Sequence, residues 1–162
     1  MVILKVPLNV AFFFHIQALF KLPHLSSIFI SLNDIPLSDL PIYIGGPVEK
    51  QSLHFIHTLG SIIPNSKQII DGIYFGGDFD TIIQIMYDKK ITKNEIRFFV
   101  GYSGWEAEQL NNEIRDDAWI VQTAKNELCM NYSTPKLWGD IIKTKKMEHA
   151  IWANMPKDPS LN

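Results

Sequence analysis

Apolar and polar residues follow one another along the chain in patterns that predict several short strands. Residues 53–59 (LHFIHTL) alternate and are rich in β-forming residues, which predicts a strand because successive side chains point to opposite faces. Residues 94–102 (NEIRFFVGY) form a nearly continuous apolar run, which predicts a central strand. Shorter runs predict strands at 41–44, in 72–78 and in 116–123. Between them, residues 61–72 are predicted to form a loop that turns at Pro64 and Asn65.

Three other segments show helical spacing. The first follows Asp78 and Asp80, either of which can cap a helix N-terminus. Its apolar stripe consists of Phe79, Ile82, Ile83 and Met86. In the second, Ser103 and Glu106 have the spacing of a capping box, in which the serine side chain accepts from an amide of the first turn and the glutamate accepts from the serine amide. Ala107, Leu110 and Ile114 continue that helix with a buried stripe.

The third predicted helix begins at Thr134 and Pro135, a capping residue followed by proline at the first helical position. Its apolar stripe consists of Leu137, Trp138, Ile141 and Ile142. Strands and helices intermix with no regular βαβ repeat, which predicts the α+β class: a single compact domain of mixed sheet with about three helices packed on it. We expect residues 36–155 to form this domain and residues 156–162, which contain two prolines, to form an extended tail.

The first 35 residues form an atypical apolar segment, possessing no acidic residue before Asp34 and five of the ten phenylalanines. His15 and Gln17 interrupt its most apolar stretch, whereas a bilayer-spanning helix needs about 18 largely apolar residues. Lys5 is isolated and no A-x-A pattern follows, so a secretory signal is disfavoured. We expect a buried helix or strand of the same domain and no membrane partner, with a signal or anchor as the alternative.

Composition excludes some classes of function. With 46% hydrophobic and 20% charged residues and a net charge of -2, the chain is globular and has no clear nucleic-acid patch. The densest basic run, residues 143–147, falls at a predicted helix end, where cations complement the helix dipole. The single cysteine, Cys129, excludes an intrachain disulfide and a cysteine zinc cluster. We expect it to be a buried, inert thiol in a cytoplasmic protein.

Ser103 is the one residue that suggests catalysis. A nucleophile elbow has the pattern G-x-S-x-G, and Gly101 fits it. However, Gly104 follows the serine directly and Trp105 occupies the second glycine position. The downstream His149 carries no mark of a catalytic base, and Asp140 lies inside a predicted helix. A helix cap is therefore the favoured interpretation of Ser103, with a serine hydrolase as the alternative.

Metal and phosphate sites are disfavoured as well. His54 and His57 are three positions apart, so on a strand they point to opposite faces and cannot share one ion. The Gly76–Gly77–Asp78 sequence before a helix resembles a phosphate cradle. It lacks the lysine and spacing of a P-loop, and Asp78 would itself occupy the free amides. We expect no metal and no cofactor.

Four blocks of the sequence resemble the AlgH/YqgE family of bacterial proteins: PIYIGGPVE, FIHTLG, GIYFGGDF and RFFVGYSGWEAEQLNNEIRDDAWIV. The ending WANMPKDPSLN is similar to that of members from Bacteroidetes-like bacteria. The resemblance runs from Pro41 to Asn162, and the N-terminal 35 residues depart from the longer start that is usual in the family. It implies a compact, cytoplasmic α+β domain. Some members have a transcriptional-regulator label, but the resemblance supplies neither a catalytic residue set nor a DNA-binding motif.

The residues that match the family blocks define the candidate site. For ligand or partner binding these are Gly45, Gly46, Pro47, Ser103, Gly104, Trp105 and Gln109. Trp105 lies off the apolar stripe of its predicted helix and stands near the polar Gln109, so it is either a recognition residue or a core residue. The working hypothesis is a non-catalytic binding or regulatory protein that contacts a small molecule or a protein near Ser103, Gly104 and Trp105. A DNA-binding regulator remains a further alternative.

Overall fold

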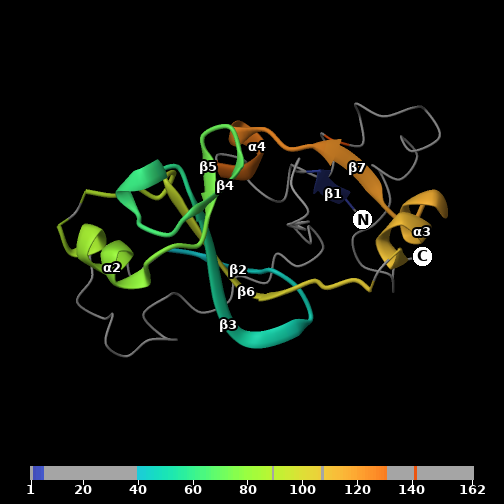
Figure 1. The fold of residues 1–162 in the computed structure, drawn as a ribbon, viewed down its shortest axis with the longest axis horizontal. Coiled ribbons are helices and arrows are strands. Elements are labelled where there is room, and N and C mark those ends of the chain that lie inside the picture. The colour runs from blue at the N-terminus through green and yellow to red at the C-terminus, as the bar shows by residue number, and fades with distance from the viewer. Residues whose placement is uncertain (1, 6–39, 89, 107, 131–140, 142–162) are drawn as a thin grey trace, which may run out of the picture.

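A five-stranded mixed sheet forms the centre of the fold (Figure 1). The computed structural model describes residues 2–5, 40–88, 90–106, 108–130 and 141. The strands are arranged in the order β2 (Ile42–Ile44), β6 (Ile96–Tyr102), β3 (Val48–His57), β5 (Ile73–Phe75) and β4 (Lys67–Ile70). β2 pairs with β6 in parallel, and the other neighbours are antiparallel. The apolar run at 94–102 therefore forms an interior strand, as predicted.

One face of this sheet packs against helix α2 (Phe79–Tyr87). Phe98 lies beside both Ile42 and Phe55 in the strand register, and these side chains are buried with Ile82 and Met86 of the helix. The N-terminus of α2 is capped as predicted, because Asp78 Oδ2 accepts from the Thr81 amide at 3.2 Å. A 3₁₀ turn, η2 (Gly60–Ile62), follows β3.

The opposite face packs against a short helix, α4 (Asn126–Met130), which the sequence pattern did not predict. Cys129 and Met130 contribute to a second buried cluster together with Ile56 and Ile73. Cys129 is buried, as expected, and its burial raises the pKa of the thiol to about 11. Such a thiol is protonated at neutral pH and therefore unreactive.

A second, two-stranded parallel sheet pairs β1 (Val2–Lys5) with β7 (Ile120–Thr123), so a strand of the N-terminal segment belongs to the fold. Helix α3 (Gln109–Arg115) precedes β7. None of the helices in the described ranges is long and apolar enough to cross a membrane. Of the predicted helix after Thr134, only Ile141 lies within the described residues, and it is buried. The predicted tail lies outside them. Together these elements confirm the α+β class.

Besides α4, the structure differs from the sequence pattern at three places between residues 48 and 109. The predicted loop at 61–72 contains β4, which forms a hairpin with β5. β3 begins at Val48 rather than at residue 53, with a register shift between these positions. The helix predicted from Ser103 begins only at Gln109, after Glu108 in a left-handed conformation with φ +64° and no side-chain cap. The proposed capping box is therefore wrong.

Candidate functional site

The Gly-Gly-Pro turn and the C-terminal end of β6 lie backbone to backbone. Parallel pairing of β2 with β6 brings them together, and the Gly45 amide continues the ladder by donating to the Val100 carbonyl at 2.8 Å. A Cβ atom added to Gly45 would lie 2.2 Å from the Gly101 carbonyl oxygen, so no larger residue fits without a shift of the backbone. We call the contact between residues 45–48 and 101–105 the motif junction.

Ser103 forms a hydrogen bond within the motif junction and does not cap a helix. Its half-buried hydroxyl donates to the Gly45 carbonyl over 3.4 Å, a contact between residues that are 58 positions apart. A nucleophilic serine would donate to a base instead. His149 and Asp140, which the sequence suggests as partners, lie outside the described residues.

Trp105 and Gln109 belong to an indole cluster centred on Glu113. The indole N–H groups of Trp105 and Trp119 donate to the same carboxylate oxygen, Glu113 Oε2, at 2.8 Å and 2.7 Å. Their rings meet edge to face, with centroids 5.6 Å apart. Gln109 donates to the other carboxylate oxygen at 2.8 Å and accepts from the Glu106 amide at 3.1 Å. The donors from Trp105, Trp119 and Gln109 keep the pKa of Glu113 below its usual value.

Sequence reasoning missed Glu113 and Trp119 as members of this cluster. The spacing of four residues between Gln109 and Glu113 signals a contact on one helix face. Trp119 had no such signal, because it comes from the segment before β7 and reaches Glu113 through the tertiary fold. The candidate residues thus divide into two neighbouring groups. Gly45, Gly46 and Ser103 form the backbone contact of the motif junction, and Trp105 and Gln109 belong to the indole cluster.

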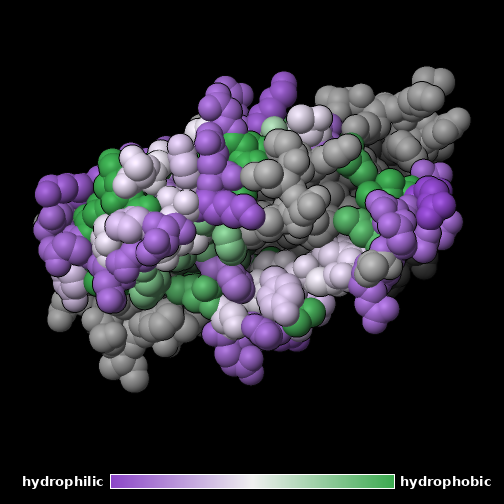
Figure 2. Space-filling view, viewed as in Figure 1, coloured by the Kyte–Doolittle hydropathy of each residue, from purple (hydrophilic) through white to green (hydrophobic). Residues whose placement is uncertain are grey.

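The motif junction also exposes apolar side chains. Val48 and Tyr102 are cross-strand partners, and they are 37% and 39% exposed. Pro47 and Gly104 are exposed beside them, and Trp105 is partly exposed. Residues 106–117 add five carboxylates and one arginine. In the view of Figure 2, hydrophilic residues dominate the described surface and hydrophobic residues come through in small separate groups. The junction is therefore a local apolar group with acidic neighbours.

The two strand histidines occupy opposite faces of β3, as predicted. His54 stacks with Phe75, whereas His57 is fully buried and stacks with Tyr74. His57 Nε2 contacts the Gly76 carbonyl at 3.0 Å, and Nδ1 accepts from the Leu59 amide at 3.2 Å. Burial lowers the pKa of His57. Within the described part of the chain, no group of three or more potential metal ligands comes together. The Asp78 carboxylate accepts from the Thr81 amide, which is one of the amides of the candidate phosphate cradle.

Comparison with known proteins identifies relatives. A family model described as AlgH-like matches residues 6–150. A UPF0301 protein from Chlorobium limicola is 38% identical over 75% of this chain and 65% of its own length. A UPF0301 protein from Bacteroides fragilis is 38% identical over 81% of this chain and 69% of its own length. The chain thus spans about two thirds of these curated relatives.

Two solved structures support the fold. The solution structure of the AlgH protein from Pseudomonas aeruginosa superposes with a TM-score of 0.60 at 17% identity, over 82% of this chain and 71% of that one. The crystal structure of protein DIP2367 from Corynebacterium diphtheriae gives a TM-score of 0.54 at 20% identity, over 71% and 61% of the two chains. Because the family match covers most of its length, the chain belongs to the AlgH-like family.

Proposed function

We propose that this chain is a non-catalytic binding module and that its motif junction contacts a partner protein. The observation that carries the proposal is the exposed Val48–Tyr102 pair at the motif junction. Below this pair the two backbones touch at glycines, with no side chain between them. Tyrosine and tryptophan are enriched at the centres of protein interfaces, and a rigid support reduces the entropy lost on binding. Pro47, Gly104 and Trp105 extend the contact surface. Gly45, Gly46, Ser103 and Gln109 hold it in shape.

Charge defines the kind of partner. The five carboxylates of residues 106–117 outnumber the single Arg115, and Glu49 is exposed next to Val48. A partner with an apolar centre and a basic rim complements this surface, whereas the phosphates of a nucleic acid would be repelled. The site is expected to act in the cytoplasm, where the single, buried Cys129 would stay reduced. A regulatory role would then be exerted through the partner rather than through DNA.

Paired variants test the proposal. Tyr102→Ser and Val48→Ser remove apolar area at the junction. Tyr87→Ser and Ile62→Ser remove exposed apolar area elsewhere and serve as matched controls, since these side chains are 45% and 63% exposed. Tagged proteins are purified from an AlgH-bearing bacterium, and proteins retained by wild type are identified by mass spectrometry. Each retained protein is then purified and titrated by calorimetry against wild type and against each of the four variants.

We expect a purified partner to bind the junction variants at least about tenfold more weakly than the controls, the loss typical of an interface hot spot. Binding should also weaken as salt is raised from 50 to 500 mM. Equal affinity for junction and control variants would refute the proposal. So would labelling by a fluorophosphonate probe that disappears in Ser103→Ala, since that result assigns a hydrolase. Salt-sensitive retention of duplex DNA would favour the DNA-binding alternative.

A further inference from the structure

We infer that the partner protein proposed above binds through an extended segment. This segment adds as a strand to an uncovered edge of β3, between a cavity at Leu53 and the motif junction. Strand addition of this kind takes its affinity from main-chain hydrogen bonds and its specificity from pockets for alternate side chains. The inference rests on the proposed function, because it specifies the part of the partner that contacts this protein.

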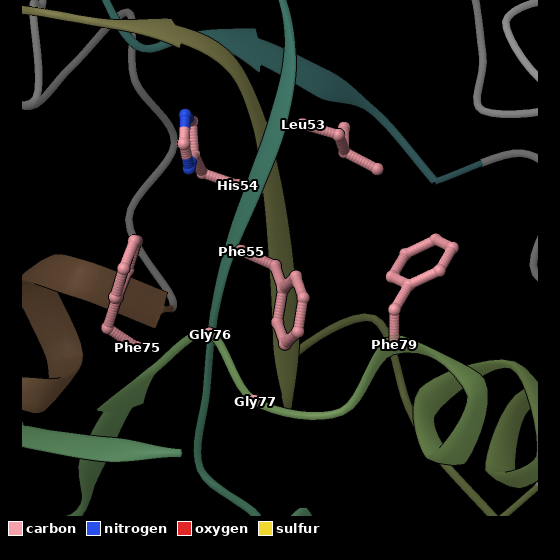
Figure 3. A pocket seen from close by; sticks show the side chains of 7 residues that line it. All are labelled: Leu53, His54, Phe55, Phe75, Gly76, Gly77 and Phe79. Carbon is pink, nitrogen blue, oxygen red and sulfur yellow. The ribbon is translucent and has the colours of Figure 1, made fainter. Parts of the chain in front are cut away.

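β3 has a neighbouring strand along only part of its β5 side. β5 pairs with β3 at Ile56 and His57, and the Gly76 amide adds one bond to the Phe55 carbonyl at 3.0 Å. At Gly76 the backbone adopts φ +61°, which favours glycine, and the chain then leaves β3 towards α2 (Figure 3). Among the described residues, no strand pairs with the β5 side of residues 48–54. This part of β3 is therefore an open strand edge.

The backbone of Leu53 points to this open edge. In an antiparallel ladder the N–H and C=O groups of one residue point to the same side, and successive residues alternate between the two sides. The Phe55 carbonyl is bonded on the β5 side, and the Thr58 amide is bonded on the β6 side, to the Glu95 carbonyl. Leu53 therefore directs its donor and acceptor towards the open edge. His54, by contrast, directs its groups towards β6, with which it is in register.

A cavity of about 400 Å³ lies at this edge, so there is space beside β3. Figure 3 shows Leu53, Phe55 and Phe79 on one side of β3 and His54 and Phe75 on the other. All of these residues except Phe55 are partly exposed. Alternate side chains of an added strand would face the two groups in turn. The volume is in the range of pockets that enclose a ligand.

The open edge leads from this cavity to the motif junction. Val48 begins β3 and is the cross-strand partner of Tyr102, and the side chains of residues 48–51 are all exposed. At 3.4 Å per residue, the distance from Leu53 to Val48 is at most about 17 Å. An extended segment of about six to eight residues is therefore long enough to occupy the cavity and reach the junction.

The surroundings of the edge define the segment. Aromatic side chains on both sides of the cavity favour apolar residues at its centre. The carboxylates near the junction favour basic residues at its ends. A second copy of this chain fits poorly, because its own exposed part of β3 would bring Glu49, Lys50 and Gln51 against the aromatic walls. The occupant is thus an apolar segment with basic ends in another protein.

The probe for this inference is the peptide acetyl-KKVFVFKK-amide, added to the full chain. Hydrogen exchange of backbone amides, followed by NMR, compares Leu53 with His54 in the same molecule. Amides bonded in a ladder are protected, so in the absence of peptide we expect Leu53 to exchange at least about tenfold faster than His54. Peptide at about ten times its Kd should slow Leu53 exchange about tenfold and leave His54 exchange unchanged.

Two variants test the cavity. Gly76 and Gly60 have φ +61° and +56°, a conformation that asparagine tolerates. Gly76 lines the cavity, and a Cβ there would meet no atom of the described residues within 4 Å, so Gly76→Asn adds a side chain where the segment would lie. Gly60→Asn is the matched control, because a Cβ there makes an ordinary 3.6 Å contact with the Tyr74 ring. We expect Gly76→Asn to bind the peptide at least about tenfold more weakly than Gly60→Asn.

Several results would overturn the inference. Equal protection of Leu53 and His54 without peptide would mean that the chain itself covers the edge. Protection of Leu53 that rises with protein concentration would assign the edge to a second copy. The inference would also fail if no peptide bound at about 1 mM, or if Gly76→Asn and Gly60→Asn bound it equally. If Gly76→Asn does not fold, the exchange comparison decides alone.

A partner captured as described above separates this inference from the proposed function. If the partner binds Tyr102→Ser more weakly than Tyr87→Ser but leaves Leu53 exchange unchanged, this inference fails and the proposed function stands. If the partner protects Leu53 but binds Tyr102→Ser and Tyr87→Ser equally, the proposed function of the junction fails.

Discussion

Adding one methyl group at Gly46 tests how closely the two backbones approach at the motif junction. In Gly46→Ala the new Cβ would lie 2.2 Å from both the carbonyl carbon and the carbonyl oxygen of Tyr102, and 2.4 Å from the Ser103 nitrogen. Ordinary contact begins at 3.4 Å, so the strands must part by about 1 Å. The opposing atoms are backbone and cannot turn aside as a flexible side chain would. Overpacking costs about 1–3 kcal/mol, and we expect the upper end of that range.

Urea unfolding followed by circular dichroism measures this loss, and a thermal scan should show a Tm lower by about 6–12 °C. Gly104→Ala is the matched control in the same motif. Its Cβ would lie 3.5 Å from Tyr102 Cε2, an ordinary contact, and the residue is exposed. We expect this variant to stay within about 0.5 kcal/mol of wild type. The close backbone contact at the motif junction would be refuted if Gly46→Ala were as stable as wild type. It would also be refuted if Gly46→Ala and Gly104→Ala lost equal free energy of unfolding.

Three further predictions concern titratable groups. Because burial lowers the pKa of His57 below 6.5, folding favours the neutral form of its side chain. The free energy of unfolding should therefore fall as the pH drops through 6.5, and it should fall less steeply in His57→Gln. Urea unfolding midpoints measured from pH 5 to pH 8 test this expectation. Because its pKa is raised to about 11, folded Cys129 should react with a thiol reagent at pH 8 roughly a hundredfold more slowly than the urea-unfolded chain; equal rates would contradict its burial. The hydrogen bonds to Glu113 lower its pKa, so an acid-induced change of tryptophan fluorescence should have its midpoint below 4.5 and should be absent in Glu113→Gln.

Local signals in the sequence were sufficient for most strands and for α2. The Asp78 cap and the buried Ile82 and Met86 follow from interactions within one helix and its first turn, which spacing records directly. β4 was missed because it has only four residues between turns at Asn65 and Gly72, both with positive φ. Its partner β5 fixes it as a strand, and a pattern of four residues does not reveal that pairing.

The candidate site depended on contacts that spacing does not record. Ser103 and Glu106 have the spacing of a capping box, but the Ser103 hydroxyl is used by Gly45. Trp105 was left between a core and a recognition role, and the Glu113 carboxylate gives it a structural partner. Both outcomes require segments that only the folded sheet brings together. The candidate residues were thus proposed from the sequence, whereas the contacts that Ser103 and Trp105 make are known only from the structure.

The position of β6 between β2 and β3 affects how the chain can fold during synthesis. β2 and β3 follow one another in sequence, yet they do not pair, because β6 is inserted between them. From His57 to Ile96 the ribosome must add 39 residues (96 − 57), about 2–8 s at bacterial rates of synthesis. During that interval the strand edges that receive β6 remain open, and open edges recruit other chains. A nascent chain released before residue 96 would thus aggregate rather than persist as a smaller folded unit.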